Sequence, residues 1–203
     1  ATIAHEIRNP MTNILGFTEI LKAEAATSPN SIYYDFIIEE LHHANSIVEE
    51  FLFLARSKPL VLKKQGLNDI LRAIAPLVQA SAVHDKKTVV FELNEVSDMN
   101  MDEKEIRQLV LNMVRNGLEA MKPGGKLKIK TFMNHGNVVM SVSDQGRGIP
   151  PEVLEKIGTP FFTTKETGTG LGLAVCYSIA ARHNAEIKIK TNRKGTTFFI
   201  IFK

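Results

Sequence analysis

Hydrophobic residues recur every three or four positions over the first 57 residues, which predicts two amphipathic helices. A polar stretch containing a proline, residues 27–31, separates them. The apolar positions are Ile3, Ile7, Pro10, Ile14, Phe17 and Leu21 in the first helix, and Ile37, Leu41, Ala44, Val48, Phe51 and Ala55 in the second. Two helices alone make a thin core, so the pattern favours a second copy and a dimeric four-helix bundle.

Beyond Ser57-Lys58-Pro59, which reads as a linker, helical and alternating patterns follow one another. Asp102 is expected to cap the second of three helices. The expected strands are 60–64, 88–93, 126–133, 137–143, 185–191 and 196–202, and the expected helices are 67–84, 103–121 and 171–183. The fold class is therefore α+β: a helical hairpin over residues 1–57, followed by an α/β sandwich over residues 58–203.

Charge also divides the chain. The net charge is only +3, too small to favour a nucleic-acid partner. Residues 1–57 carry −5 and the remainder +8, so the basic half could assist the binding of an anion such as ATP, or the asymmetry is a solvated surface. Cys176, the only cysteine, is expected in the core of a protein from a reducing compartment. No apolar run is long enough to span a membrane, and His5 lies so near the start that we expect an upstream part to be missing.

Two glycine clusters suggest a nucleotide pocket. Asp144 precedes Gly146 and Gly148, where a carboxylate can accept a hydrogen bond from the adenine amine, although a tight turn would explain these residues equally well. The second cluster, Gly168-Thr169-Gly170-Leu171-Gly172, opens a helix whose free amides favour phosphate oxygens. Residues 160–167 between them read as a lid that brings Lys165 to the phosphates, or as an ordinary surface loop.

Asn112 and Asn116 are one turn apart on the helix expected over 103–121, so they share one face. Amide oxygens there suit Mg²⁺, a hard cation that also takes phosphate ligands. Asparagine and the following Gly117 both disfavour a helix interior, which indicates a site, although such a pair alone is more often a satisfied surface pair. His5 falls between apolar positions Ile3 and Ile7, so its side chain is expected to point away from the core.

These residues together closely resemble the sensor histidine kinases of two-component systems, over essentially the whole chain. The segment Ala4–Pro10 is similar to the family's H box and Asn112–Met121 to its N box. Its G1, F and G2 boxes resemble Asp144–Gly148, Pro160–Lys165 and Gly168–Gly172. The helix over residues 37–56 is similar to that of Bacillus sporulation kinases.

The resemblance implies roles for individual residues. His5 would accept the phosphoryl group, Glu6 would raise its nucleophilicity, and Asn9 would position water for dephosphorylation of the partner. Asn116, assisted by Asn112, would bind Mg²⁺. The residues implied for ATP binding are Asn112, Asn116, Asp144, Gly146, Gly148, Lys165, Gly168, Thr169, Gly170, Leu171, Gly172 and Thr197.

The resemblance also implies a dimerisation and phosphotransfer hairpin joined to a Bergerat-type ATP domain. The expected activity is autophosphorylation on His5 with ATP and Mg²⁺, then transfer to an aspartate of a response regulator receiver domain, with phosphatase activity as a further possibility. The implied partners are that regulator, a second copy of the chain and a small inhibitory protein on the hairpin, and the implied location is cytoplasmic. A related ATPase would carry glutamate, as a base for water, where Asn112 stands, and a non-catalytic ATP-binding scaffold would not explain the intact set of boxes.

Overall fold

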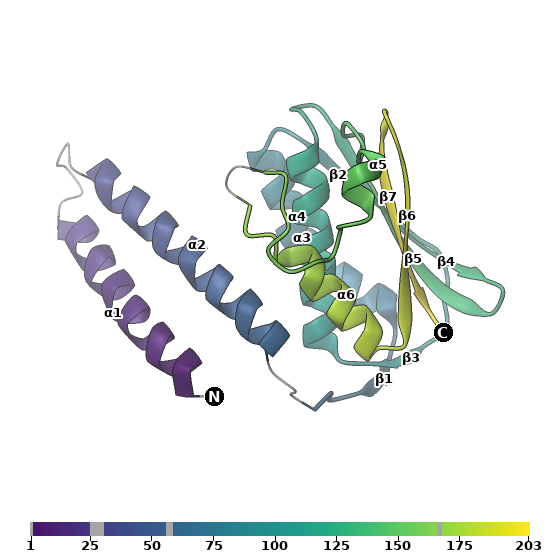
Figure 1. Cartoon of the computed structure of the whole chain (residues 1–203), viewed down its shortest axis with the longest axis horizontal. Helices are drawn as coiled ribbons and strands as arrows, with labels where there is room; N and C mark the ends of the chain where they lie inside the picture. Colours follow the sequence, from purple (N-terminus) through teal and green to yellow (C-terminus); the bar gives the residue numbers. More distant parts are fainter. Residues whose placement is uncertain (1, 25–30, 56–58, 166–167) are drawn as a thin grey trace. The chain divides into compact units, whose positions relative to one another are not determined.

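The computed structural model describes residues 2–24, 31–55, 59–165 and 168–203 (Figure 1). Side chains are described from Met11 onward, apart from those of Glu24, Ser31 and His43. The chain divides into two compact units, Ala1–Ser57 and Lys58–Lys203. A helical hairpin followed by an α/β sheet domain is the predicted fold class, and the structure confirms it.

The first unit consists of α1 (Thr2–Glu24) and α2 (Ser31–Ala55), which pack against each other. The helix α1 continues through Pro10. Among the described side chains, several that the periodicity assigns to a buried stripe are exposed in the single hairpin: Phe17 is 68% exposed, Ile14 50% and Phe51 49%. The hairpin alone therefore leaves much of its apolar surface uncovered.

The second unit is built on a five-stranded sheet with the order β2-β4-β5-β7-β6. Only the β2–β4 pair is parallel; the other pairs are antiparallel. These strands are β2 (Thr88–Leu93), β4 (Lys126–Asn134), β5 (Asn137–Ser143), β6 (Ala185–Asn192) and β7 (Gly195–Phe202). In Figure 1, three helices cover one face of the sheet: α3 (Leu67–His84), α4 (Glu103–Ala120) and α6 (Gly172–Arg182).

Successive side chains of each strand point to opposite faces of the sheet, so every second side chain faces the helices. Leu127, Ile129 and Thr131 of β4 are fully buried, and Thr131 donates a hydrogen bond to Asn68 of α3. The expected core position of Cys176 is confirmed, since this residue of α6 is fully buried beside the Leu109 carbonyl of α4. The helices and the sheet thus share one core, and α4 lies within it.

Three elements differ from the expectation. The strand expected at 60–64 is only β1 (Lys63–Gln65), because the Val61 amide donates to the Asp102 carboxylate instead of to a neighbouring strand. Its partner is β3 (Met99–Met101), which the periodicity did not indicate. A four-residue helix, α5 (Pro151–Leu154), was also not expected.

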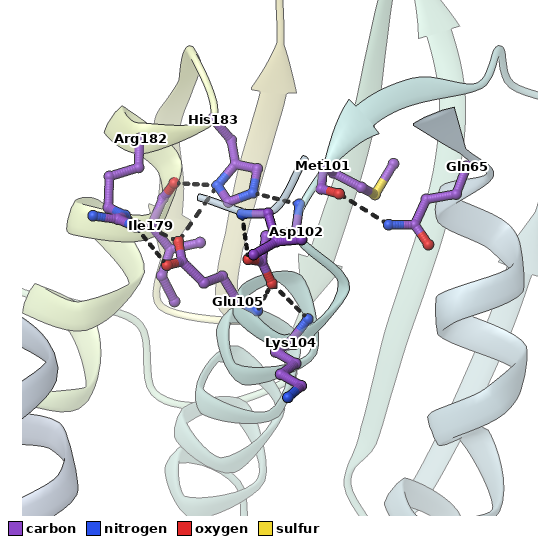
Figure 2. Close-up of polar contacts among 9 residues, drawn as sticks. Gln65, Met101, Asp102, Lys104, Glu105, Ile179, Arg182 and His183 are labelled. Carbon is purple, nitrogen blue, oxygen red and sulfur yellow. Dashed lines mark hydrogen bonds and ion pairs between the residues drawn. The ribbon is translucent and has the colours of Figure 1, made fainter. Parts of the chain in front are cut away.

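A buried histidine joins the two helices that carry the site residues (Figure 2). The Asp102 amide, at the start of α4, donates to His183 Nε2 at 3.0 Å. The other ring nitrogen, Nδ1, donates to the Ile179 carbonyl of α6 at 2.8 Å. Arg182 forms two hydrogen bonds with Glu105 of α4, at 2.8 and 3.1 Å. These contacts fix α4 against α6.

Candidate nucleotide site

The Asp144 carboxylate lies where β5 ends and the first glycine segment begins. Its Oδ1 accepts hydrogen bonds from the amides of Gly146, at 2.8 Å, and Thr196, at 3.2 Å. Burial raises the pKa of this carboxyl above its ordinary value of 3.8, although the two amides oppose that shift. A half-buried carboxylate held by two backbone donors is an oriented acceptor for one further donor.

The glycines of this segment permit close backbone approach. Gly148 has φ of +76°, and a Cβ there would lie 2.0 Å from the Asn192 carbonyl oxygen. A Cβ on Gly146 would lie 2.6 Å from the Ala120 carbonyl oxygen, at the end of α4. The segment is therefore pressed between α4 and the β6–β7 turn, which brings Asp144 beside the asparagine-bearing helix.

Asn112 and Asn116 lie on α4 as predicted, and both face into the site. Asn112 is buried and its Nδ2 donates to the Gly172 carbonyl at 3.2 Å. Asn116 Nδ2 is buried without a hydrogen-bond partner in the structure. An unpartnered buried amide is costly, and a ligand that satisfied it would offset that cost. Packing also explains the glycine at position 117, because a Cβ on Gly117 would lie 2.5 Å from the Leu127 side chain.

Lys165 reaches α4 from the loop between the two glycine segments. Its Nζ donates to Asn116 Oδ1 at 3.2 Å and forms an ion pair with Glu119. Glu119 was not predicted from the sequence, yet it follows Asn116 by three positions on the same helical face, a signal that was available. Lys165 thus contacts Asn116 and has the Glu119 carboxylate as its ion-pair partner, and its expected contact with phosphates stays a prediction.

The second glycine segment leads into α6. Gly170 has φ of +69°, and a Cβ there would lie 2.4 Å from the carbonyl carbon of Phe161, whose amide donates to the Gly170 carbonyl. Thr169 Oγ1 accepts from the Leu171 amide, and Leu171 is fully buried. A Cβ on Gly168 would lie 2.5 Å from Thr163 Oγ1. No side chain caps α6 at Leu171, which leaves its first turn suited to an anion.

The structure brings Thr196, not Thr197, to Asp144. Thr196 is buried and its amide bonds the carboxylate. Thr197 belongs to the opposite face of the sheet, where its hydroxyl donates to Ser143 Oγ at 2.9 Å. Neighbouring residues of a strand face opposite sides, so Thr196 and Thr197 lie on different faces of the sheet, and the expected role of Thr197 stays a prediction.

His5, Glu6 and Asn9 lie in α1, as predicted. Their side chains are outside the part of the chain that the structure describes, so the expected orientation of His5 stays a prediction. The two units are described separately, and the site above belongs to residues 58–203 alone.

Two protein-family models match the chain. One describes the histidine kinase-, DNA gyrase B- and HSP90-like ATPase and matches residues 101–203, which include every predicted nucleotide-binding residue. The other describes the His Kinase A (phospho-acceptor) domain and matches residues 1–59, which include His5. The chain belongs to the sensor histidine kinase family.

Individual histidine kinases agree with this assignment. Sporulation kinase C of Bacillus subtilis is 36% identical over 204 residues, covering 99% of this chain and 47% of that protein. Sporulation kinase A of the same organism is 35% identical over all of this chain and 34% of its own length. This histidine kinase chain therefore spans less than half the length of these relatives.

Solved structures of histidine kinases are also similar to this chain. Full-length ShkA in complex with AMPPNP matches with a TM-score of 0.87 at 25% identity, covering all of this chain and 44% of that one. The histidine kinase ThkA in complex with the response regulator protein TrrA matches with a TM-score of 0.72 at 32% identity, covering 100% and 60%. In the described residues of this histidine kinase, no helix has the length and apolar character needed to cross a membrane.

Proposed function

We propose that this histidine kinase transfers the γ-phosphoryl group of ATP to His5 and then to an aspartate of a response regulator receiver domain. The observation that carries the proposal is the joint presence of a phospho-acceptor hairpin and an ordered nucleotide site in one chain. In the first step, a neutral imidazole nitrogen bonds to the γ-phosphorus while the bond to the β–γ bridging oxygen breaks, which releases ADP, and the proton of the imidazole passes to solvent.

The ATP site follows from the contacts of residues 58–203. Asp144 accepts from the adenine amine, as its two backbone donors leave the second carboxylate oxygen oriented for this. Gly146 and Gly148 admit the base, and the segment from Gly168 to Gly172 presents the start of α6 to the phosphates. We place Thr196 in this site in place of Thr197, because Thr196 is the residue that reaches Asp144.

The residues around Asn116 fit Mg²⁺ bound together with ATP. The amide oxygens of Asn116 and Asn112 are hard ligands of the type that this cation takes, and the buried, unpartnered amide nitrogen of Asn116 would donate to a phosphate oxygen. Bound Mg²⁺ would neutralise charge on the phosphates. When ATP binds, Lys165 would give up its contacts with Asn116 and Glu119 and interact with the phosphates instead.

On α1, Glu6 would hydrogen-bond the His5 imidazole and raise its nucleophilicity. Asn9, one turn after His5, would position water when the regulator is dephosphorylated. The exposed apolar side chains of the hairpin support a homodimer, in which a second hairpin covers them. A regulator partner is supported by the complex of ThkA with the response regulator protein TrrA. A small inhibitory protein that binds the hairpin stays a further proposal.

A simple ATPase is the second candidate, and one position disfavours it. Efficient hydrolysis needs a base for water, and asparagine at position 112 supplies none. Asn112 is instead engaged with the Gly172 carbonyl. Phosphoryl transfer to a histidine needs no such base, because the imidazole is itself the nucleophile.

The test is incorporation of label from γ-labelled ATP. His5→Gln should abolish acid-labile labelling while leaving ATP affinity within twofold of the starting chain. His42→Gln is the matched control, since His42 is an exposed histidine of α2, and it should label normally. Persistent acid-labile labelling of His5→Gln would overturn the assignment, and subsequent loss of label to an added receiver domain tests the second step.

A further inference from the structure

The sheet of residues 58–203 has a second face, away from α3, α4 and α6, which carries an open trough of about 660 Å³. Strand alternation assigns the trough residues to this face. In β4, Thr131 bonds Asn68 of α3, so its neighbours Lys130 and Phe132 face away from the helices. In β7, buried Thr196 faces Asp144, and its neighbour Thr197 lines the trough. Asp144 of the proposed ATP site is also part of this lining, but that site does not account for the lysines and phenylalanines of the trough.

The charge of the trough is positive and is arranged in two rows. One row lies on β4, with Lys128 and Lys130, and the other lies on β6 and the turn after it, with Lys190 and Lys194. Glu92 and Asp144 are the acidic residues of the lining, and Glu92 pairs with Lys128 at 2.7 Å. The lining therefore carries an excess of positive charge, in contrast to the acidic hairpin.

The floor between the two rows is partly apolar. Phe132 and Phe199 contribute aromatic surface, and the hydroxyls of Ser141, Ser143 and Thr197 lie among them. Lys130 Nζ lies 5.9 Å from the centre of the Phe132 ring, which associates one lysine with the aromatic floor. Aromatic rings flanked by cations are a composition found at protein interfaces, where aromatic residues anchor and charges orient.

The width of the trough selects the shape of the occupant. From β4 to β6 there are three strand spacings, which amount to about 14 Å at about 4.8 Å each. An α-helix with its side chains is about 10–12 Å across, so it fits between the lysine rows. Carboxylates on both flanks of such a helix would reach one row each, while an apolar stripe would lie on Phe132 and Phe199.

We propose that this face of the sheet docks an acidic amphipathic helix of a partner protein. The proposal does not rest on phosphoryl transfer, since no residue of the two lysine rows belongs to the proposed ATP site. A protein helix is favoured over an anionic lipid surface because two phenylalanines lie between the lysine rows, where the apolar stripe of a helix would contact them.

The test uses the whole chain and a fluorescein-labelled synthetic helix of about four turns, with leucine along one face and glutamate on both flanks. A peptide of the same composition in scrambled order is the control probe. Fluorescence anisotropy should show saturable binding of the patterned peptide and at least tenfold weaker binding of the scrambled one. Equal binding of the two peptides, or no binding of either, would overturn the proposal.

Paired variants locate the binding. Lys130→Glu with Lys190→Glu should weaken the patterned peptide at least tenfold, because it reverses one charge in each row. Lys63→Glu with Lys104→Glu makes the same change in net charge on exposed lysines outside the trough and should change the affinity less than twofold. Phe199→Ser should weaken binding without any change of charge. Circular dichroism and ATP affinity report folding of each variant.

Two further outcomes count against the proposal. If both lysine pairs weaken the peptide equally, the attraction is a property of net charge and the trough is not its site. The chain could instead bind vesicles that contain phosphatidylserine and fail to bind the peptide. If Lys130→Glu with Lys190→Glu then abolishes vesicle binding, the face is a lipid-binding surface. Labelling of His5 is measured on the same variants, and its persistence separates failure of docking from failure of the proposed kinase activity.

Discussion

Asp144 combines burial with two backbone donors, and this combination makes ATP binding sensitive to pH. The ionised carboxylate is a stronger acceptor for the adenine amine than the neutral acid is, and burial raises the pKa of this carboxyl above 3.8. Since the folded state holds this proton more tightly than the unfolded chain does, the charged carboxyl costs stability above its pKa. That cost is relieved as the pH falls through the raised value. Acid should therefore weaken nucleotide affinity at Asp144 without destabilising the fold there.

The change Asp144→Asn tests this directly. We expect ATP to bind about tenfold more weakly at neutral pH, from loss of a charge-assisted hydrogen bond. We also expect the part of the acid dependence due to this carboxyl to disappear. Isothermal titration calorimetry over a range of pH measures both, with exposed Glu95→Gln as the control. An unchanged pH profile in Asp144→Asn would remove the adenine role from this residue.

Lys165 is paired with Glu119, and this ion pair is expected to compete with the binding of Lys165 to the phosphates of ATP. The ion pair and the bond from Lys165 to Asn116 have to be exchanged when ATP and Mg²⁺ bind. The change Glu119→Gln removes the charge that pairs with Lys165. Because a partly exposed ion pair contributes about 0–1 kcal/mol, ATP should bind up to about fivefold more tightly to this variant. Titrations at low and high salt check this, since the difference should shrink with salt. Weaker binding would instead mean that Glu119 contributes to the metal site.

Thr196 shows which residue-level features the sequence could not determine. The last strand has the sequence Thr-Thr-Phe-Phe-Ile-Ile-Phe. Because each residue type occurs at two successive positions, the two faces of the strand are nearly equal in hydrophobicity. A shift of one residue exchanges the faces, so periodicity alone could not decide between Thr196 and Thr197. Asparagines four apart on α4 raised no such ambiguity, because i and i+4 share a face in any helix.

At the scale of elements, Asp102 joins more parts of the fold than its role as a cap suggests. Its carboxylate accepts from the amides of Val61, Lys104 and Glu105, and its own amide donates to His183. Burial opposes ionisation, but the three backbone donors outweigh it and hold the pKa of Asp102 below 3.8. Its stabilisation is thus present above pH 3.8 and is lost as the pH falls through the lowered pKa.

We expect Asp102→Ala to destabilise residues 58–203 by about 1–3 kcal/mol, because it removes a helix cap together with the anchor for Val61. Thermal unfolding should show this as a loss of several degrees in Tm for a unit of this size. Exposed Asp98→Ala provides the comparison and should change Tm little. A Tm for Asp102→Ala equal to that of Asp98→Ala would show that the bonds at Asp102 contribute nothing net.

Asp102 also explains why the two-stranded sheet of β1 and β3 was not predicted well. Residues 60–64 alternate like a strand, but the Val61 amide is taken by Asp102, which shortens β1 to three residues. Its partner β3 is also three residues long, too short for periodicity to be distinguishable. Long elements such as α3 and β5 were predictable because each carries several repeats of its period.

At the scale of the whole molecule, burial is unequal between the two units. Every hydrophobic residue that is buried in the described part of the chain lies between Leu67 and Phe202. Among the described residues of the hairpin, only Thr18 and Glu50 are buried. Several of its large apolar side chains are 44–68% exposed, and others, such as Leu41 and Val48, are only partly buried. The sequence indicated this, because two amphipathic stripes without a third element leave each other only partly covered.

This inequality predicts that a second hairpin completes the core of the first unit. Phe17 is 68% exposed on α1, and Phe17→Glu would place a charge inside the four-helix interface. We expect sedimentation to show that this change converts a dimer to a monomer. The affinity of the variant chain for ATP, whose proposed site lies in residues 58–203, should stay within twofold. Val83→Glu places the same charge on an equally exposed residue of α3 and should leave the dimer intact. A dimer that survives Phe17→Glu, or dissociates equally in Val83→Glu, would mean that the exposed stripe of the hairpin is not the surface through which two chains associate.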